Sequence, residues 1–365
     1  MKKFIYISII LILSSCGSSD DNMPSGDGYD RSNLLTNIYD NIIIPSYEVF
    51  YNDIQLLENN VTALISNPNP SQFELDEVRS SWELAYKSWQ SVEMFNLRKA
   101  EELSYSSIMN AYPCIEINIE DYMSDSVFEI SSFTPSLLGA TGFPAVGYMI
   151  YAKESSLLHG GGPNEATTYL NALVQNMKNN TELVYNDWLS ARSEFISSTA
   201  NTRTSSLNII LNEFVKYFEK KVRTSKIANP INYFGDQQPD PTQVESYYKR
   251  DLCKPLLMEA FSSVKRFYNG ESRLGVNGEG LSDYLGFLDR QELDLTINNQ
   301  FINIEQNIEL LDNDFVAQLD LDGATGQLRS TFLSMQNLVT YFKTDMLVVS
   351  FGIELDYQDN DGDGG

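Results

Sequence analysis

The sequence predicts an all-α protein built from two tandem, related helical bundles. Apolar residues recur at helical spacing through most of the 365 residues, and part of the first third returns in the last third at a constant offset of 250 positions. The clearest apolar stripe is formed by Val78, Trp82, Ala85, Trp89 and Val92, which share one helix face. The repeat pairs Tyr51 with Phe301, Ile54 with Ile304, Val61 with Leu311, Ile65 with Phe315, Val78 with Leu328 and Trp82 with Phe332. Each half is therefore expected to contain two helices of matching length joined by a loop.

The chain begins with a targeting segment, residues 1–15. Lys2 and Lys3 precede an apolar run over residues 4–13, which is too short to span a membrane. Leu13-Ser14-Ser15-Cys16 resembles the lipobox of bacterial lipoproteins, which implies that Cys16 is lipidated and anchors the protein. A secretory cleavage site that happens to end in cysteine is the alternative. Residues 16–30 are rich in Gly, Ser and Asp and predict a flexible tether.

The first bundle is expected over residues 31–200. Its predicted helices run over 34–65 with a kink or restart at Pro45, from Ser71 or Phe73 to Leu103, from the Gly-Phe-Pro turn at 142–144, and over 165–197. Asn67-Pro68-Asn69-Pro70 is a turn, and residues 104–140 are expected to be irregular.

The second bundle is expected over residues 201–357. Helices are predicted at 204–224, at 242–268 and from Leu281 onward, with a Gly-rich loop over 270–280. Residues 358–365 form an acidic tail. Within it, Asp359 to Gly364 matches the first half of a calcium-binding loop, but the sequence given contains no glutamate beyond it to complete the ligand set. We therefore interpret it as an acidic tail.

The net charge argues against one class of partner, and the state of the cysteines remains open. A formal charge of −25 argues against nucleic acid, whose phosphates require basic surfaces. Besides Cys16 the chain contains Cys114 and Cys253, and an oxidising envelope would permit a disulfide between them. Two free buried thiols are the equal alternative.

The segment Gly142-Phe143-Pro144-Ala145-Val146-Gly147-Tyr148 resembles the signature of the imelysin family, the peptidase M75-like proteins. There a Gly-x-His-x-x-Glu motif opens a helix at the junction of the two bundles. Here the His position is Pro144 and the Glu position is Gly147, so both chemical groups are missing. The resemblance extends to the segments 112–116, 223–230 and 343–347, and it implies an outer-membrane lipoprotein of the Bacteroidota type, facing the periplasm or the cell surface.

Three functions remain open at this point. A metallopeptidase would need converging His and carboxylate ligands, but the single histidine, His159, lies in a Gly-rich loop, so we expect no catalytic residues. The resemblance implies a non-catalytic binding protein linked to iron or metal uptake, whose cofactor, if any, would be iron or another divalent cation. Candidate polar residues of its cleft are Glu116, Glu120, Arg223, Lys226 and Asp345. A structural or interaction lipoprotein without a small ligand is the third interpretation.

Overall fold

The computed structural model describes residues 27–124, 130, 134–159 and 163–357. The targeting segment, Cys16, most of the tether and the acidic tail lie outside these residues. Throughout the described part the protein is all-α, and its β pairing is confined to one isolated bridge between Glu271 and Asn277. In the same residues no helix is long and apolar enough to cross a membrane.

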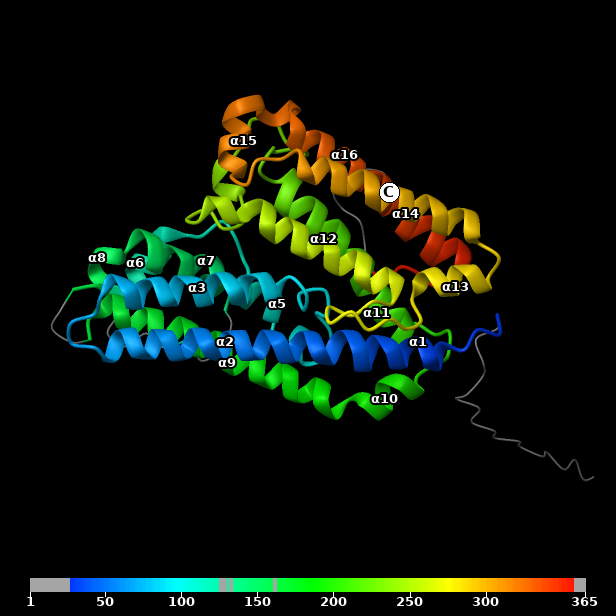
Figure 1. The fold of residues 1–365 in the computed structure, drawn as a ribbon, viewed down its shortest axis with the longest axis horizontal. Coiled ribbons are helices and arrows are strands. Elements are labelled where there is room, and N and C mark those ends of the chain that lie inside the picture. Colours follow the sequence, from blue (N-terminus) through cyan, green and yellow to red (C-terminus); the bar gives the residue numbers. More distant parts are fainter. Residues whose placement is uncertain (1–26, 125–129, 131–133, 160–162, 358–365) are drawn as a thin grey trace, which may run out of the picture.

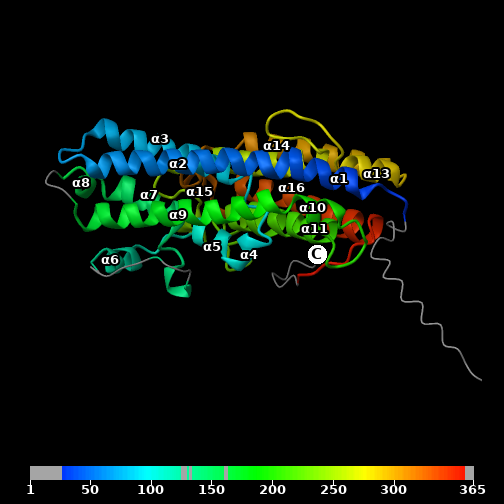
Figure 2. The same ribbon diagram turned by 90° about the horizontal axis from the view of Figure 1, so that it is seen from below.

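The first half of the chain supplies a long helical layer (Figures 1 and 2). Its α-helices are α1 (Arg31–Asn37), α2 (Ile44–Ser66), α3 (Gln72–Trp89), α4 (Lys99–Glu102), α5 (Tyr105–Met109), α6 (Glu116–Ser124), α7 (Gly142–Gly147), α8 (Glu154–Leu157), α9 (Glu165–Ser190) and α10 (Arg192–Ser197). π-helical segments span Ile38–Ile43 and Tyr148–Ala152, and a 3-10 turn spans Pro135–Leu137. Helix α2 packs between α3 and α9 along most of its length.

The second half lies against this layer as a second group of helices (Figure 1). Its α-helices are α11 (Ser206–Lys216), α12 (Cys253–Asn269), α13 (Leu281–Phe287), α14 (Gln291–Glu309), α15 (Phe315–Asp322) and α16 (Gln327–Thr340). Helices α11 and α16 continue as π-helical segments, Tyr217–Ala228 and Tyr341–Ser350, and 3-10 turns span Pro241–Gln243, Arg250–Leu252 and Gly323–Thr325. Helix α14 packs on α16 as α2 packs on α3, and the matched positions in Tyr51–Ile54 and Val78–Trp82 have their counterparts on α14 and α16. The counterparts of Val61 and Ile65 differ, because Leu311 follows the end of α14 and Phe315 begins α15.

Both halves contribute aromatic rings to one continuous hydrophobic core. In the first half the Tyr86 ring stacks on Phe143 with 4.3 Å between centroids, and in the second Phe214 stacks on Phe267 at 4.9 Å. All members of the predicted stripe from Val78 to Val92 are buried. The two halves are also joined at the start of the fold, because α1 reaches the second half: the Asn37 amide donates to the Gly270 carbonyl at 2.8 Å.

Three predicted helix boundaries are wrong. The helix expected to reach Leu103 ends at Trp89, and the helix expected from residue 242 begins at Cys253. The helix expected over 165–197 breaks at Ala191 into α9 and α10. The first two errors have one cause: residues 90–97 and 244–249 leave helical geometry and place buried polar side chains at the junction between the halves. Of the two alternatives at Pro45, the structure agrees with a restart, because α2 begins at Ile44 after the π-helical segment Ile38–Ile43 and Pro45 stands in its first turn.

Candidate functional site

The signature helix α7 lies at the junction and is fully buried. Gly142 begins it with φ +72°, and a β-carbon there would collide with the carbonyl oxygens of Ile108 and Met109. Only glycine satisfies both conditions. Pro144 fits the first turn because that position needs no backbone donor. The Gly-Phe-Pro sequence therefore has a sufficient structural reason without any chemistry.

The two motif positions face a space that is almost closed. Pro144 and Gly147 line a cavity of about 10 Å³, which is about the room for one water molecule. A β-carbon on Gly147 would lie 3.0 Å from Cζ2 of Trp82, whose Nε1 is fixed by donating to the Phe143 carbonyl at 3.1 Å. Trp82 thus occupies the space that a side chain at position 147 would need. The remaining walls of the cavity are Tyr112, Cys114, Val244, Ser246, Tyr247 and Tyr248.

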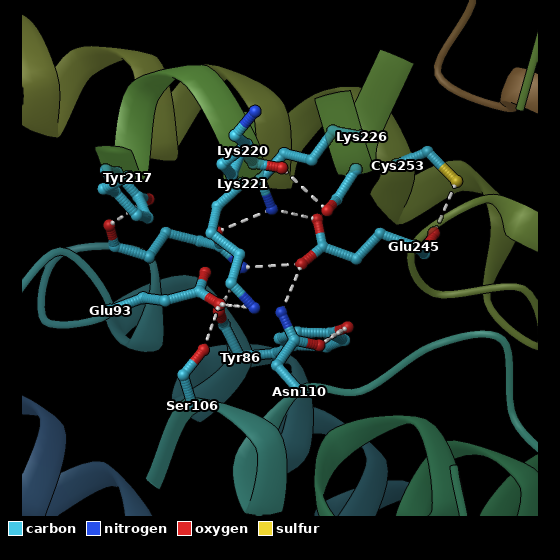
Figure 3. A network of polar contacts seen from close by, with 12 residues as sticks. Tyr86, Glu93, Ser106, Asn110, Tyr217, Lys220, Lys221, Lys226, Glu245 and Cys253 are labelled. Atoms are coloured by element: carbon cyan, nitrogen blue, oxygen red, sulfur yellow. Dashed lines mark hydrogen bonds and ion pairs between the residues drawn. The ribbon is translucent and has the colours of Figure 1, made fainter. Parts of the chain in front are cut away.

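A buried ionic network lies beside this helix (Figure 3). The Lys226 ammonium contacts the Glu245 carboxylate and donates to Oε1 of Gln90 at 2.8 Å. Glu245 accepts further bonds from Gln90 at 3.2 Å and from Asn110 at 2.8 Å. Asn110 in turn accepts from the Tyr86 hydroxyl at 2.7 Å. Lys226 and Glu245 are only 2% and 3% exposed, so the pair is held by complementary partners rather than by water.

The local sequence explains how Lys226 enters this network. Lys226 lies in the π-helical segment Tyr217–Ala228, in which Glu219 and Arg223 are also buried. The hydroxyls of Thr224 and Ser225 each donate at 2.8 Å to the carbonyl five residues earlier. These side-chain bonds support the widened turns, which are a frequent feature of functional sites.

A second buried carboxylate, Glu93, adjoins the network. Its Oε1 accepts from Ser106 at 3.2 Å and lies 3.8 Å from the Lys221 ammonium. Its Oε2 is buried without a hydrogen bond in the described part of the chain. Burial raises the pKa of Glu93, and repulsion from Glu245 adds to the shift, while Lys221 and Lys226 oppose it.

An open pocket of about 280 Å³ lies next to this network at the junction. The residues that line it are Ser107, Asn110, Ala111, Tyr112, Pro113, Ile115, Leu138, Gly139, Lys221 and Ser225. The first eight belong to the first half, and the last two to the π-helical segment Tyr217–Ala228 of the second. We call this the junction pocket. It has the mixture of apolar walls and a few polar groups that is typical of small-molecule sites.

The candidate cleft residues fall into separate clusters. Glu116 accepts from the Tyr248 hydroxyl at 2.6 Å, and Glu120 forms an ion pair with Lys153 at 2.5 Å and contacts the hydroxyl of Tyr148. Burial opposes ionisation of Glu120, but bonds from Lys153 and Tyr148 outweigh it and lower its pKa. These residues adjoin the signature helix, since Tyr148 and Tyr248 are in edge contact at 5.2 Å.

The other candidates do not join them. Arg223 is buried with Gln336 and lies 3.9 Å from Glu219, a carboxylate that also accepts from the Tyr357 hydroxyl at 2.6 Å. Asp345 is half-buried on the other π-helical segment of the second half, where its backbone carbonyl accepts from Ser350. Lys226 is the single member of the five that enters the network described above.

The described residues contain no preformed set of metal ligands. Across 27–124, 130, 134–159 and 163–357, no group of three or more His, Cys, Asp or Glu side chains is arranged to hold an ion. His159 is exposed in its loop. Cys114 and Cys253 are both free, and burial raises the pKa of each thiol to about 12.

Sequence reasoning missed four members of the junction: Gln90, Glu93, Asn110 and Glu245. The available signal was a polar residue inside an apolar run, as for Glu93 between Val92 and Met94. Such a residue is expensive to bury unless it is paired. The sequence does not say which distant residues pair with it.

Comparison with known proteins places this geometry in context. The family profile described as Imelysin (Peptidase_M75) matches residues 43–338. No curated protein matches significantly. An imelysin-like protein from Psychrobacter arcticum 273-4 has a similar structure, with a TM-score of 0.69, 14% identity, and 90% of this chain and 97% of that chain covered. A protein from Parabacteroides distasonis ATCC 8503 described as an iron-regulated protein A precursor gives 0.65 and 17%, with 88% and 96% covered.

Proposed function

Because the chain belongs to the imelysin family, we propose that it is a non-catalytic binding lipoprotein of the cell envelope, linked to iron or metal uptake. The ligand is held in the junction pocket. The observation that carries the proposal is the contrast at the junction: the motif positions Pro144 and Gly147 face a closed cavity of about 10 Å³, whereas the adjoining junction pocket offers about 280 Å³.

The motif positions support the proposed lack of catalysis. A His and a carboxylate three residues apart on a helix can share a metal or a proton. Pro144 and Gly147 supply neither group, and Trp82 lies where a side chain at position 147 would extend. Glu116 and Glu120, the nearest carboxylates among the candidates, are engaged by Tyr248 and by Lys153 with Tyr148.

Attachment to the outer membrane through Cys16 belongs to the same proposal. It is supported by the lipobox-like sequence 13–16 and by the polar stretch that follows it. The word precursor in the description of the Parabacteroides distasonis protein is in line with export. Replacing Cys16 with Ala should release the protein from washed membranes without detergent, and retention of the variant would contradict lipid anchoring.

The binding proposal is tested on the soluble Cys16→Ala chain, purified without a metal-affinity tag. Calorimetric titration with iron, zinc, calcium and an iron chelate should give stoichiometric binding for at least one of them. Ala111→Trp, which fills the junction pocket, should abolish it. Leu321→Trp, at a position 79% exposed, is the matched control and should bind normally.

Two results would contradict the proposal. Absence of any binding, or binding that survives Ala111→Trp, would favour the structural lipoprotein, an alternative that the closed motif cavity supports. Cleavage of an unfolded protein substrate that a chelator stops would show that the chain is a metallopeptidase.

A further inference from the structure

Resting on the proposed function, we infer that the junction pocket recognises an anion, namely the carboxylates of a small organic acid, either free or as an anionic iron chelate. The inference concerns the class of ligand. It follows from the polar groups that line the pocket, their burial and their remaining hydrogen-bonding capacity.

Lys221 supplies the positive charge of the pocket. Its side chain is 37% exposed, so the ammonium is accessible from the pocket it lines. Within the described residues its ionic contact is with Oε1 of Glu93 at 3.8 Å, which is longer than a hydrogen bond. The three N–H donors of the ammonium therefore remain available to a ligand.

Glu93 lies at ion-pair distance from this charge without a hydrogen bond to it. Desolvation and Glu245 raise the pKa of Glu93, while Lys221 and Lys226 oppose the shift. The other buried carboxylate, Glu245, is already matched by Lys226 and by the amides of Gln90 and Asn110. Lys221 is thus the cation of the network that has most to gain from an added negative charge.

Tyr112, which lines both the junction pocket and the motif cavity, adds a neutral donor to the pocket. Its hydroxyl makes no hydrogen bond to any other described residue. Desolvation raises the pKa of Tyr112 well above the ordinary value, and Glu245 and Glu93 add to the shift. The hydroxyl therefore stays protonated and can donate to a carboxylate oxygen.

The pocket lacks what a bare hard cation requires. Such ions take carboxylate and carbonyl oxygens, whereas no acidic side chain is among the described residues lining the junction pocket. Pro113, Ile115 and Leu138 form an apolar wall, and the volume of about 280 Å³ limits the ligand to a small molecule. A compact organic acid fits the pocket volume and can accept hydrogen bonds from Lys221 and Tyr112.

The test uses citrate, ferric citrate, free iron and sorbitol as a neutral polyol, titrated calorimetrically into the soluble Cys16→Ala chain. Citrate or ferric citrate should bind, and sorbitol should not. Lys221→Gln should weaken binding by about 10- to 100-fold, which corresponds to the loss of one charged hydrogen bond. Tyr112→Phe should weaken it several-fold. Lys265→Gln removes the same charge from a side chain that is 34% exposed and paired with Glu305, and it should have no effect.

The titrations distinguish a free organic acid from its iron chelate, and they distinguish failure of this inference from failure of the proposed function. Equal binding of citrate and ferric citrate supports recognition of the organic acid, and binding of ferric citrate alone supports recognition of the chelate. Sorbitol binding as tightly as citrate, or unchanged affinity in both Lys221→Gln and Tyr112→Phe, overturns the inference. Free iron binding that Ala111→Trp blocks, without citrate binding in either form, overturns the inference and leaves the proposed function standing. No binding at all overturns both.

Discussion

The ion pair between Lys226 and Glu245 offers the sharpest test of how the junction is held together. Lys226→Met keeps the length and removes the charge. It leaves Glu245 with Gln90 and Asn110 as donors but without a counter-charge, in a place where the carboxylate is 3% exposed. Breaking one partner of a buried pair costs about 3–5 kcal/mol of unfolding free energy. This is much more than a surface pair contributes.

The same loss can be expressed as a melting temperature. With about 2.1 cal/mol/K of unfolding entropy per residue, a cooperative transition of the whole chain should shift downward by about 4–7 °C. Differential scanning calorimetry measures this shift, and urea unfolding followed by circular dichroism measures the free energy. Lys265→Met is the control, because its pair with Glu305 is partly exposed to solvent on both sides (34% and 41%) and should contribute at most about 1 kcal/mol.

A double variant, Lys226→Met with Glu245→Leu, completes the cycle. Replacing a buried pair by apolar residues is often neutral or stabilising, so the double variant should recover most of the loss. A loss below about 1 kcal/mol in Lys226→Met, or a double variant whose loss equals the sum of the singles, would refute the reasoning. Either result would mean that water reaches the Lys226–Glu245 pair or that the two residues contribute independently to stability.

Three further predictions concern the same region. Because burial raises the pKa of Glu93, the folded state binds its proton more tightly than the unfolded state, so this residue favours folding at low pH and opposes it as pH rises above the ordinary carboxyl range. Glu93→Gln should therefore gain stability relative to the unaltered protein between about pH 4 and about pH 7.5 in urea titrations, and a constant difference would contradict this. Gly147→Glu should lose about 1–3 kcal/mol in urea unfolding because Trp82 must move, and an unchanged midpoint would show that the cavity can open. Cys114 and Cys253 should resist alkylation in the native Cys16→Ala chain, because both thiols are free and have raised pKa values. After unfolding without reductant, both should react fully, as measured by mass spectrometry. If the two cysteines stayed unreactive in the unfolded chain, they would form a disulfide.

Helical periodicity located much of the architecture from local signals. The stripe around Trp82 and Trp89 is buried as expected, and the turn at residues 67–70 precedes α3. Ser71 caps that helix, since its Oγ accepts from the Glu74 backbone N–H at 3.4 Å, and the Glu74 carboxylate in turn accepts from the Ser71 backbone N–H at 2.8 Å. These features depend on residues within a few positions of one another, so a short window of sequence contains the information.

The helix ends near the junction could not be predicted in the same way. Val92 continues the apolar stripe of α3 at helical spacing, yet the chain turns after Trp89. Buried there, the Gln90 amide donates to Glu245, 155 residues away in the sequence. A partner at that distance leaves no mark on the local pattern, although it decides whether the buried amide is satisfied.

The sequence by itself determined the all-α class and the pairing of related helices in the two halves, and it has Pro144 and Gly147 at the positions where the resemblance led us to expect a His and a Glu. Local propensity and residue identity are sufficient for these. Only the tertiary structure decided that Trp82 occupies the space beside Gly147, that Lys226 is matched by Glu245, and that Lys221 lines an open pocket. These properties depend on packing volume and on which distant charges share a low-dielectric space, and both are set when the two halves meet.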